Sequence, residues 1–194
     1  TREILLVPHA NREQNLQATS RAAELLQDAG ITVRVCADEK VLPGLKHVPH
    51  TEDAASGCEL VLVLGGDGTF LRAADMARSV DIPVLGINLG HVGFLAEWEV
   101  ESLDQALVRV IDKRYRIEDR LTIDVTIFDE EGTLLNRSWA LNEASVENQN
   151  RSGVLDAILE VDRRPVSSFG CDGVLISTPT GSTAYAFSAG GPVL

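Results

Sequence analysis

The stretch Leu60-Val-Leu-Val-Leu64, followed directly by Gly65-Gly66-Asp67-Gly68-Thr69, decides the fold of this chain. Five apolar residues in a row are typical of a strand buried on both faces, as in a parallel sheet covered by helices. Helical spacing follows at once and predicts a helix over 69–79, through Phe70, Ala73, Ala74 and Ala77. Strand, glycine loop and helix thus follow one another without a linker, and such a helix N-terminus suits an anion.

The same alternation of apolar runs and helical spacing extends over residues 1–114. Strands are predicted at 4–7, 31–36, 59–64 and 82–87, and helices at 11–29, 69–79 and 102–113. Gly30 stands where a helix C-terminal glycine belongs, and 37–57 is expected to be a loop with room for one short helix. The alternation predicts an α/β domain with a mostly parallel sheet.

The pattern changes near Tyr115. Leu121–Ile127 alternates strictly, as in a strand with one face in water, and 129–132 is a hairpin turn. Further strands are predicted at 137–147, 154–161, 165–169 and 174–177. We therefore expect two domains, 1–114 α/β and 115–194 all-β and sandwich-like. Because the sequence stops at Leu194 in an apolar stretch, we expect further sequence to complete the second domain.

The composition is that of a globular protein, with 194 residues, 44% hydrophobic and 24% charged. Acidic residues outnumber basic ones by 29 to 17, a net charge of −12. Without a basic stripe, nucleic acid and membrane surfaces are not expected partners, and a phosphate ligand would need main-chain N–H groups and a metal. Three cysteines far apart in sequence, Cys36, Cys58 and Cys171, indicate a reducing, cytoplasmic location.

A carboxylate, Asp67, stands inside the glycine loop. The loop is not a Walker loop, because no Lys-Ser or Lys-Thr follows its last glycine, and it lacks the G-x-G-x-x-G spacing of dinucleotide-binding folds. Asp67 would repel a bound phosphate unless it holds a metal or takes up a proton. The alternative is that Asp67 only caps the helix.

The adjacent pair Asn142-Glu143 could bind a nucleoside, because an amide can bond the edge of adenine and a carboxylate can accept from ribose hydroxyls. Neighbours on a regular strand face opposite ways, so both can reach one ligand only where the strand ends or bulges. The alternative is a strand-end turn with solvated side chains.

The run from Gly170 to Gly191 carries five hydroxyl side chains within residues 177–183, interrupted by Pro179 and Gly181. These two residues argue against a regular strand or helix there. A hydroxyl-rich loop beside Tyr185 could bond a polar ligand while the ring stacks on a flat base. The alternative is a surface turn, with Tyr185 and Phe187 in a core.

Together these segments resemble the NAD kinase family. The matching segments are 65–69, Gly86-Ile-Asn-Leu-Gly-His-Val-Gly-Phe94, Asn142-Glu143, Asp172-Gly173 and 177–185. The resemblance covers nearly the whole chain, in order. The glycine-Asp-glycine loop alone is shared with lipid kinases and, loosely, phosphofructokinases, whereas the long hydroxyl run is far more specific.

The resemblance implies a role for each matching residue. Asp67 would be the base that receives the proton of the 2′-hydroxyl of NAD's adenosine ribose, and Asp172 would reach the nicotinamide end, in the family often across a subunit contact. Arg72 is a weaker candidate, for a phosphate contact. The other implied ligand contacts are Gly66, Gly68, Phe94, Asn142, Glu143, Thr183, Ala184, Tyr185 and Ser188.

The implied activity is transfer of a phosphoryl group from ATP or polyphosphate to NAD, giving NADP, with Mg²⁺ or another divalent metal and no assigned metal ligand. A homodimer or homotetramer in the cytoplasm is expected. The rival enzyme is a lipid or other small-molecule kinase with the same loop. A non-catalytic nucleotide-sensing module is the rival from another class, and a dehydrogenase is disfavoured because the dinucleotide glycine pattern is missing.

Overall fold

The computed structural model describes residues 1–9, 13–36, 44–89, 93, 95–96, 98–99, 102–148 and 153–194. Its Cα positions divide the chain into two units, Thr1–Ile117 and Glu118–Leu194, called here the N-terminal and the C-terminal unit. In the described part, no helix is both long and apolar enough to cross a membrane.

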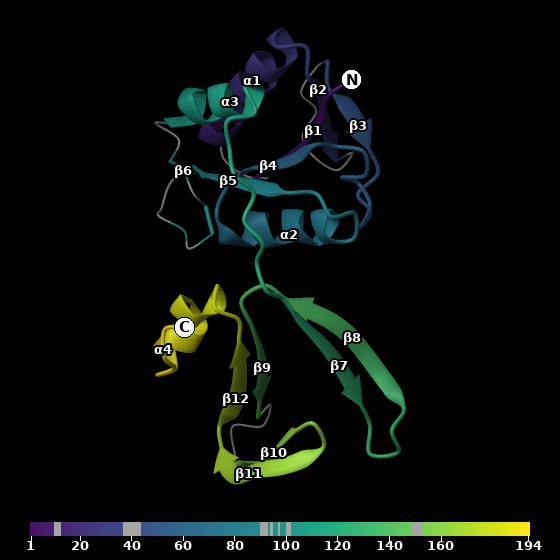
Figure 1. The fold of residues 1–194 in the computed structure, drawn as a ribbon, viewed down its shortest axis with the longest axis vertical. Coiled ribbons are helices and arrows are strands. Elements are labelled where there is room, and N and C mark those ends of the chain that lie inside the picture. Colours follow the sequence, from purple (N-terminus) through teal and green to yellow (C-terminus); the bar gives the residue numbers. More distant parts are fainter. Residues whose placement is uncertain are drawn as a thin grey trace. The chain divides into compact units, whose positions relative to one another are not determined.

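The N-terminal unit is built on a sheet of parallel strands (Figure 1). In the described residues its strands are β1 Glu3–Pro8, β2 Thr32–Cys36, β3 Lys46–Val48, β4 Leu60–Leu64, β5 Val84–Asn88 and β6 Trp98–Glu99. Their order across the sheet is β3-β2-β1-β4-β5-β6. The strands predicted from apolar runs are present as β1, β2, β4 and β5, and the mostly parallel α/β fold is confirmed.

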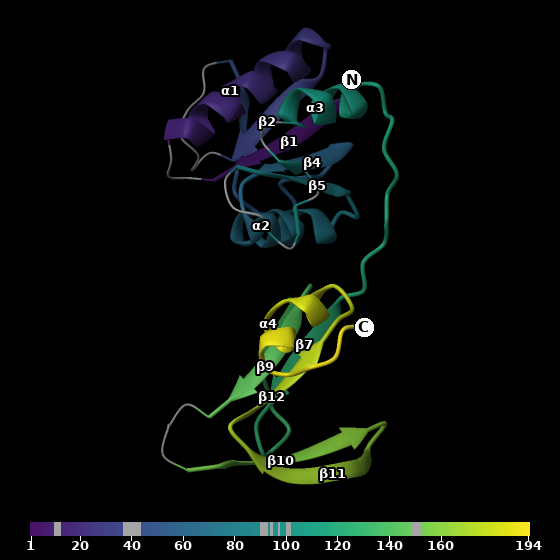
Figure 2. The ribbon, with the colours of Figure 1, turned by 90° about the vertical axis from the view of Figure 1, so that its left-hand side faces the viewer.

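Three helices cover the two faces of this sheet in the described chain: α1 Glu13–Asp28, α2 Asp67–Arg78 and α3 Leu103–Ile111. Figure 2 shows α1 and α3 on one face and α2 on the other. All three were predicted, and Gly30 follows α1 with φ +75°, the left-handed conformation in which a helix commonly ends.

The core lies in two layers because successive residues of a strand point to opposite faces. Ile4 and Leu6 pack in the layer that contains α1 and α3, whereas Leu5 and Val7 pack in the layer that contains α2. All four side chains are at most 1% exposed. The unbroken apolar run of β1 is therefore explained by helices on both sides.

The C-terminal unit is β-rich, as predicted, and its described strands form two-stranded antiparallel pairs. The pairs are β7 Ile123–Phe128 with β8 Leu134–Ala140, β9 Glu143–Glu147 with β12 Gly173–Ser177, and β10 Leu155–Val161 with β11 Arg164–Cys171. A short 3-10 turn, η2 Gly181–Thr183, and one helical turn, α4 Tyr185–Ser188, follow β12.

Three details differ from the sequence prediction. The segment 37–57 contains a strand, β3, in its described part, and no apolar pattern marks it because Lys46 and His47 are exposed. The two-residue strand β6 was not predicted. The single strand predicted at 137–147 is two strands, β8 and β9, which belong to different pairs and are separated at Leu141-Asn142.

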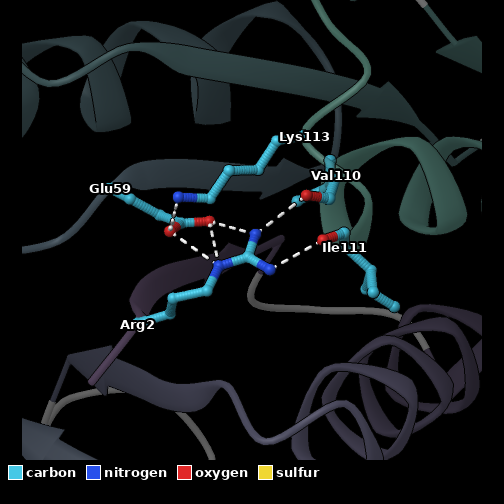
Figure 3. Close-up of polar contacts among 5 residues, drawn as sticks. All are labelled: Arg2, Glu59, Val110, Ile111 and Lys113. Carbon is cyan, nitrogen blue, oxygen red and sulfur yellow. Dashed lines mark hydrogen bonds and ion pairs between the residues drawn. The ribbon is translucent and has the colours of Figure 1, made fainter.

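Arg2 ties three elements together at the end of the N-terminal sheet where β1 and β4 begin (Figure 3). Its Nε donates to both carboxylate oxygens of Glu59, at 3.1 and 2.8 Å, and its Nη2 donates to Glu59 Oε1 at 2.5 Å. Nη1 and Nη2 also donate to the carbonyls of Ile111 at 2.7 Å and Val110 at 2.9 Å. One guanidinium thus caps the C-terminal end of α3, where a cation is favoured.

The first prediction concerns Glu59→Gln. The Arg2 guanidinium holds the pKa of the Glu59 carboxyl below its usual value of 4.5. Its stabilisation is therefore present at neutral pH and lost as the pH falls through the lowered pKa. The variant should lose about 1–3 kcal/mol of unfolding free energy at pH 7, and the difference from wild type should shrink below about pH 4.

Denaturant unfolding at several pH values measures this difference. Asp104→Asn is the matched control, because its pair with Arg21 is exposed by half or more on both sides and exposed pairs contribute little. A Glu59→Gln penalty that is the same at pH 3 and pH 7 would contradict the assignment.

Candidate functional site

The glycine loop lies at the point where the sheet reverses its winding. From β1 the chain passes through α1 on one face, and from the neighbouring β4 it passes through α2 on the other. Connections that leave adjacent strands for opposite faces open a crevice at the carboxyl ends of these strands, where α/β proteins bind ligands. Here the two strand ends are joined by a hydrogen bond from the His9 N–H to the Leu64 carbonyl at 2.9 Å.

The glycines of the loop fall into two kinds. A Cβ at Gly65 would lie 2.8 Å from Thr69 Oγ1 and 3.1 Å from His9 Cβ, so only glycine allows the strand end to pack against the first turn of α2. At Gly66 and Gly68 a Cβ would meet no atom of the described residues within 4 Å. No described residue therefore fills the space beside the backbone at these two positions, and a ligand could use that space for close approach.

Asp67 is the first residue of α2. The cap position before it is occupied by Gly66, which has no side chain that could cap the helix. The Asp67 carboxylate instead accepts a hydrogen bond from the Leu95 N–H at 3.0 Å. Gly93 lies so close that a Cβ there would be 2.6 Å from Asp67 Oδ1. The alternative that Asp67 only caps its helix is thus not supported, and its side chain contacts the predicted second glycine-rich loop.

Arg72 lies one turn into α2 and reaches back to the end of β1, where its Nη2 donates to the Pro8 carbonyl at 3.1 Å. The side chain therefore lies beside the loop. Its role as a phosphate contact stays a prediction. Phe94, expected to pack against the ligand, lies outside the described residues.

Asn142 and Glu143 lie where β8 ends and β9 begins in another strand pair. This break meets the condition under which both side chains can reach one ligand. Asn142 Oδ1 and Glu143 Oε2 are buried yet have no hydrogen-bond partner among the described residues. Since buried acceptors are nearly always bonded, the pair is suited to a ligand that donates hydrogen bonds.

Three of the five hydroxyls in the run 177–183 donate hydrogen bonds to backbone carbonyls of the chain. Ser177 Oγ donates to the Thr178 carbonyl at 2.9 Å, Thr178 Oγ1 to the Leu141 carbonyl at 2.6 Å and Ser182 Oγ to the Pro179 carbonyl at 2.8 Å. These three hydroxyls stabilise the chain itself. The loop also contains the 3-10 turn η2, although Pro179 and Gly181 argued against regular structure.

The residues expected around adenine are the last residue of this run, Thr183, and three residues after it, Ala184, Tyr185 and Ser188. Thr183 ends η2, while Tyr185 and Ser188 begin and end α4, and all three are exposed; Ala184, between the two turns, is half-buried. The Tyr185 side chain is 52% exposed and Phe187 is 58% exposed, so the alternative of a core position is not supported in the described unit. Their contact with a ligand stays a prediction.

Asp172 is not brought near Asn142 and Glu143 within the chain. It precedes Gly173, which pairs with Glu147 at one end of the β9–β12 ladder, whereas Glu143 pairs with Ser177 at the other end. Five paired residues at about 3.3 Å each separate the two ends by about 13 Å. Asp172 is exposed, and its expected role at the nicotinamide end stays a prediction.

No group of three or more His, Cys, Asp or Glu side chains suited to a metal ion occurs among the described residues. The site residues found here therefore do not form a cage of protein ligands.

The family is settled by comparison with known proteins. Residues 4–115 match the ATP-NAD kinase N-terminal domain, and residues 141–194 match the ATP-NAD kinase C-terminal domain. The chain belongs to the NAD kinase family. The predicted resemblance is thereby confirmed.

Curated members of the NAD kinase family match the chain from end to end. The NAD kinase of Corynebacterium efficiens is 66% identical over 201 residues, which cover 100% of this chain and 63% of that protein. The NAD kinase of Rhodococcus jostii is 57% identical over 212 residues, which cover 100% and 66%. This chain therefore spans less than two thirds of the length of these relatives.

Solved structures share the fold. Yeast NADH kinase in complex with NADH superposes with a TM-score of 0.87 at 23% identity, covering 100% of this chain and 62% of that one. An NAD kinase from Archaeoglobus fulgidus in complex with ATP gives a TM-score of 0.67 at 26% identity, covering 100% and 67%. An α/β domain followed by a β-rich domain is thus the fold of this family.

Sequence reasoning missed residues that shape the site without offering a side chain to a ligand. Gly93 lies in the predicted second glycine-rich loop, but no role was predicted for it. The Leu95 N–H that donates to Asp67 is a backbone group, which no sequence pattern marks. Gly181 approaches Asn142 so closely that a Cβ would lie 2.6 Å from Asn142 Cα and nearer still to its carbonyl. The glycine itself was the available signal, because it interrupts a run of larger polar residues.

The second prediction concerns Gly181→Ala. The added methyl group would collide with the Asn142 backbone, and backbone cannot move aside as a flexible side chain can. The variant should lose about 1–3 kcal/mol or more of unfolding free energy, measured by denaturant unfolding. Thr180→Ala, next to it in the turn, is the control and should stay within about 0.5 kcal/mol of wild type. A Gly181→Ala variant as stable as wild type would mean that the close approach is absent in solution.

Proposed function

We propose that this protein is an NAD kinase, which transfers a phosphoryl group from ATP or polyphosphate to the 2′-hydroxyl of the adenosine ribose of NAD and so forms NADP. The observation that carries the proposal is the Asp67 carboxylate at the start of α2. It stands between two glycines beside which no described residue lies within 4 Å of a Cβ position, in a chain of this family. A carboxylate in a loop suited to phosphate needs a chemical task, and proton removal from an acceptor hydroxyl supplies one.

In the proposed step, Asp67 accepts the proton of the 2′-hydroxyl as its oxygen forms the bond to phosphorus. Phosphoryl transfer passes through a loose transition state, so positioning and neutralisation of charge contribute more than a strong base does. A carboxylate suffices because the hydroxyl proton becomes acidic late, as that bond forms. The N-terminus of α2, with Gly66 and Gly68, would hold the phosphates through main-chain N–H groups, and Arg72 would add a cation beside them.

NAD would be bound by the C-terminal unit. Asn142 Oδ1 and Glu143 Oε2 are buried acceptors without a partner among the described residues, and the amino group of adenine and the ribose hydroxyls are donors of hydrogen bonds. The exposed ring of Tyr185 would stack on the base, beside Thr183, Ala184 and Ser188. Asp172 would contact the nicotinamide end, and Phe94 would pack against the ligand.

Mg²⁺, when bound, would neutralise charge on the phosphates of the donor. No protein ligand is assigned to it. We also propose that the protein is cytoplasmic and forms a homodimer or homotetramer. In such an assembly Asp172, which lies far along the β9–β12 ladder from Asn142, would reach a ligand held by another subunit.

The third prediction concerns Asp67→Asn in the full-length protein. The amide keeps the size of the side chain and can still accept from the Leu95 N–H, so the fold and the Kd for NAD should stay near wild type. Turnover should fall by about 10²–10⁴-fold, the range for loss of a general base. Steady-state kinetics with NAD, ATP and Mg²⁺, with NADP as the measured product, check this.

Asp75→Asn, two turns further along α2, is the matched control for the removal of one charge from the same helix. It should keep turnover near wild type. Turnover within a few-fold of wild type in Asp67→Asn would remove Asp67 from the role of base.

The fourth prediction concerns Gly68→Ala. A Cβ at this position meets no atom of the residues that the structure describes within 4 Å, and alanine is the better helix former by about 1 kcal/mol. Protein stability should therefore be unchanged or raised. The KM for ATP should rise, because the methyl group occupies the space into which the donor's phosphates would come. A variant with raised stability and an unchanged KM would contradict the phosphate role of the loop.

One assay separates the rival functions. The full-length protein is incubated with NAD, ATP and Mg²⁺, and the formation of NADP is followed. A lipid or other small-molecule kinase, or a non-catalytic sensing module, would form none. Substitution of polyphosphate for ATP and of NADH for NAD then identifies the donor and the redox form of the acceptor.

A further inference from the structure

The bend at Leu141-Asn142 belongs to neither of the two strand pairs that it connects. β8 pairs with β7 up to Ala140, and β9 pairs with β12 from Glu143 onward. The carbonyls of Leu141 and Asn142 therefore lack a partner in a strand ladder, and a backbone carbonyl buried without a partner is unfavourable. Leu141 is 7% exposed, so solvent is a poor substitute there.

Thr178 supplies these two carbonyls with the hydrogen-bond donors that the strand ladders do not provide. Its side chain is 0% exposed, and its Oγ1 lies 2.6 Å from the Leu141 carbonyl oxygen and 3.1 Å from that of Asn142. Its backbone N–H donates to the same Asn142 carbonyl at 2.9 Å. Thr178 Oγ1 also accepts from the Gly181 N–H at 3.0 Å, so one residue joins the bend to the turn that follows β12.

The neighbouring hydroxyls do not share this role. Ser177 Oγ is 3.4 Å from the Asn142 carbonyl, a weak contact, and lies closer to the Thr178 carbonyl at 2.9 Å. Ser182 Oγ donates within its own turn, to Pro179. Among these hydroxyls, that of Thr178 makes the close contacts with the bend.

The two acceptor atoms of the bend depend on this support. Asn142 Oδ1 and Glu143 Oε2 have no partner among the described residues, so these two atoms are not oriented by bonds of their own. The backbone at the bend sets the positions from which both side chains extend. We propose that Thr178 is a positioning residue, whose buried hydroxyl holds the bend so that Asn142 and Glu143 present their acceptors to NAD. The proposal rests on the proposed function, in which these two residues bind NAD.

Thr178→Val in the full-length protein tests the proposal, because valine keeps the shape and removes the hydroxyl. The Kd for NAD, measured by calorimetry without turnover, should rise about tenfold, as expected for one lost hydrogen bond that orients a binding group. The KM for ATP should stay within about threefold of wild type. Thr178→Ser, which keeps the hydroxyl, should keep the Kd for NAD within about threefold.

A control distinguishes positioning from general loss of stability. Thr19 in α1 is 1% exposed, and Thr19→Val removes a buried hydroxyl from the N-terminal unit. Its unfolding midpoint is measured beside that of Thr178→Val, and its Kd for NAD should equal wild type. If Thr178→Val lowers the midpoint but leaves the Kd unchanged, Thr178 is only structural and the proposal is wrong. If Thr178→Val does not fold, Thr178→Cys, with a weaker donor, replaces it with the same two outcomes.

A coupling measurement shows whether the effect passes through Asn142. In an Asn142→Ala background, Thr178→Val should add less than about threefold to the Kd, because the group that it positions is gone. Full additivity would overturn the proposal. Failure of the wild-type protein to bind NAD would overturn the proposed function and this inference together, whereas binding by wild type with an unaffected Thr178→Val overturns the inference alone.

Discussion

The N-terminal unit depends on the parallel pairing of β1 with β4, whose register runs from Ile4 opposite Leu60 to Pro8 opposite Leu64. These strands are far apart in sequence, and the chain leaves them for opposite faces of the sheet. Their carboxyl ends therefore meet without a helix between them. The glycine loop, the start of α2 and Arg72 lie at that edge because of this pairing, and Arg2 with Glu59 supports it from the other end of the same two strands (Figure 3).

The position of Asp67 shows how a negative charge is accepted in a loop built for anions. The positive end of the α2 dipole favours a carboxylate in the first turn, and the Leu95 N–H gives it a defined hydrogen-bond partner. The hydrogen bond from Leu95 gives the half-buried carboxylate a defined direction, and a positioned group is what the proposed role of Asp67 requires.

Sequence reasoning predicted the strands and helices whose own residues show a hydrophobic pattern. The apolar runs of β1 and β4 and the spacing along α1 are local signals, and the glycine loop marks the ligand edge of the sheet. Short strands were missed because three residues such as Lys46–Val48 have no measurable period. The break at Leu141-Asn142 was raised only as a condition for ligand contact and was not placed in the predicted strand 137–147, because the Thr178 hydroxyl that contacts these two carbonyls lies 37 and 36 residues away.

Glycine has two different structural roles in this chain, and only the structure distinguishes them. At Gly93 and Gly181 a side chain would collide with Asp67 or with the Asn142 backbone, so glycine permits a contact inside the protein. At Gly66 and Gly68 no contact among the described residues explains why a side chain is absent. The first kind of glycine permits the contacts that place Asp67 and Asn142, and the second kind leaves space that no described residue fills. Both kinds occur around Asp67, which is the strongest physical reason to regard it as part of a ligand site.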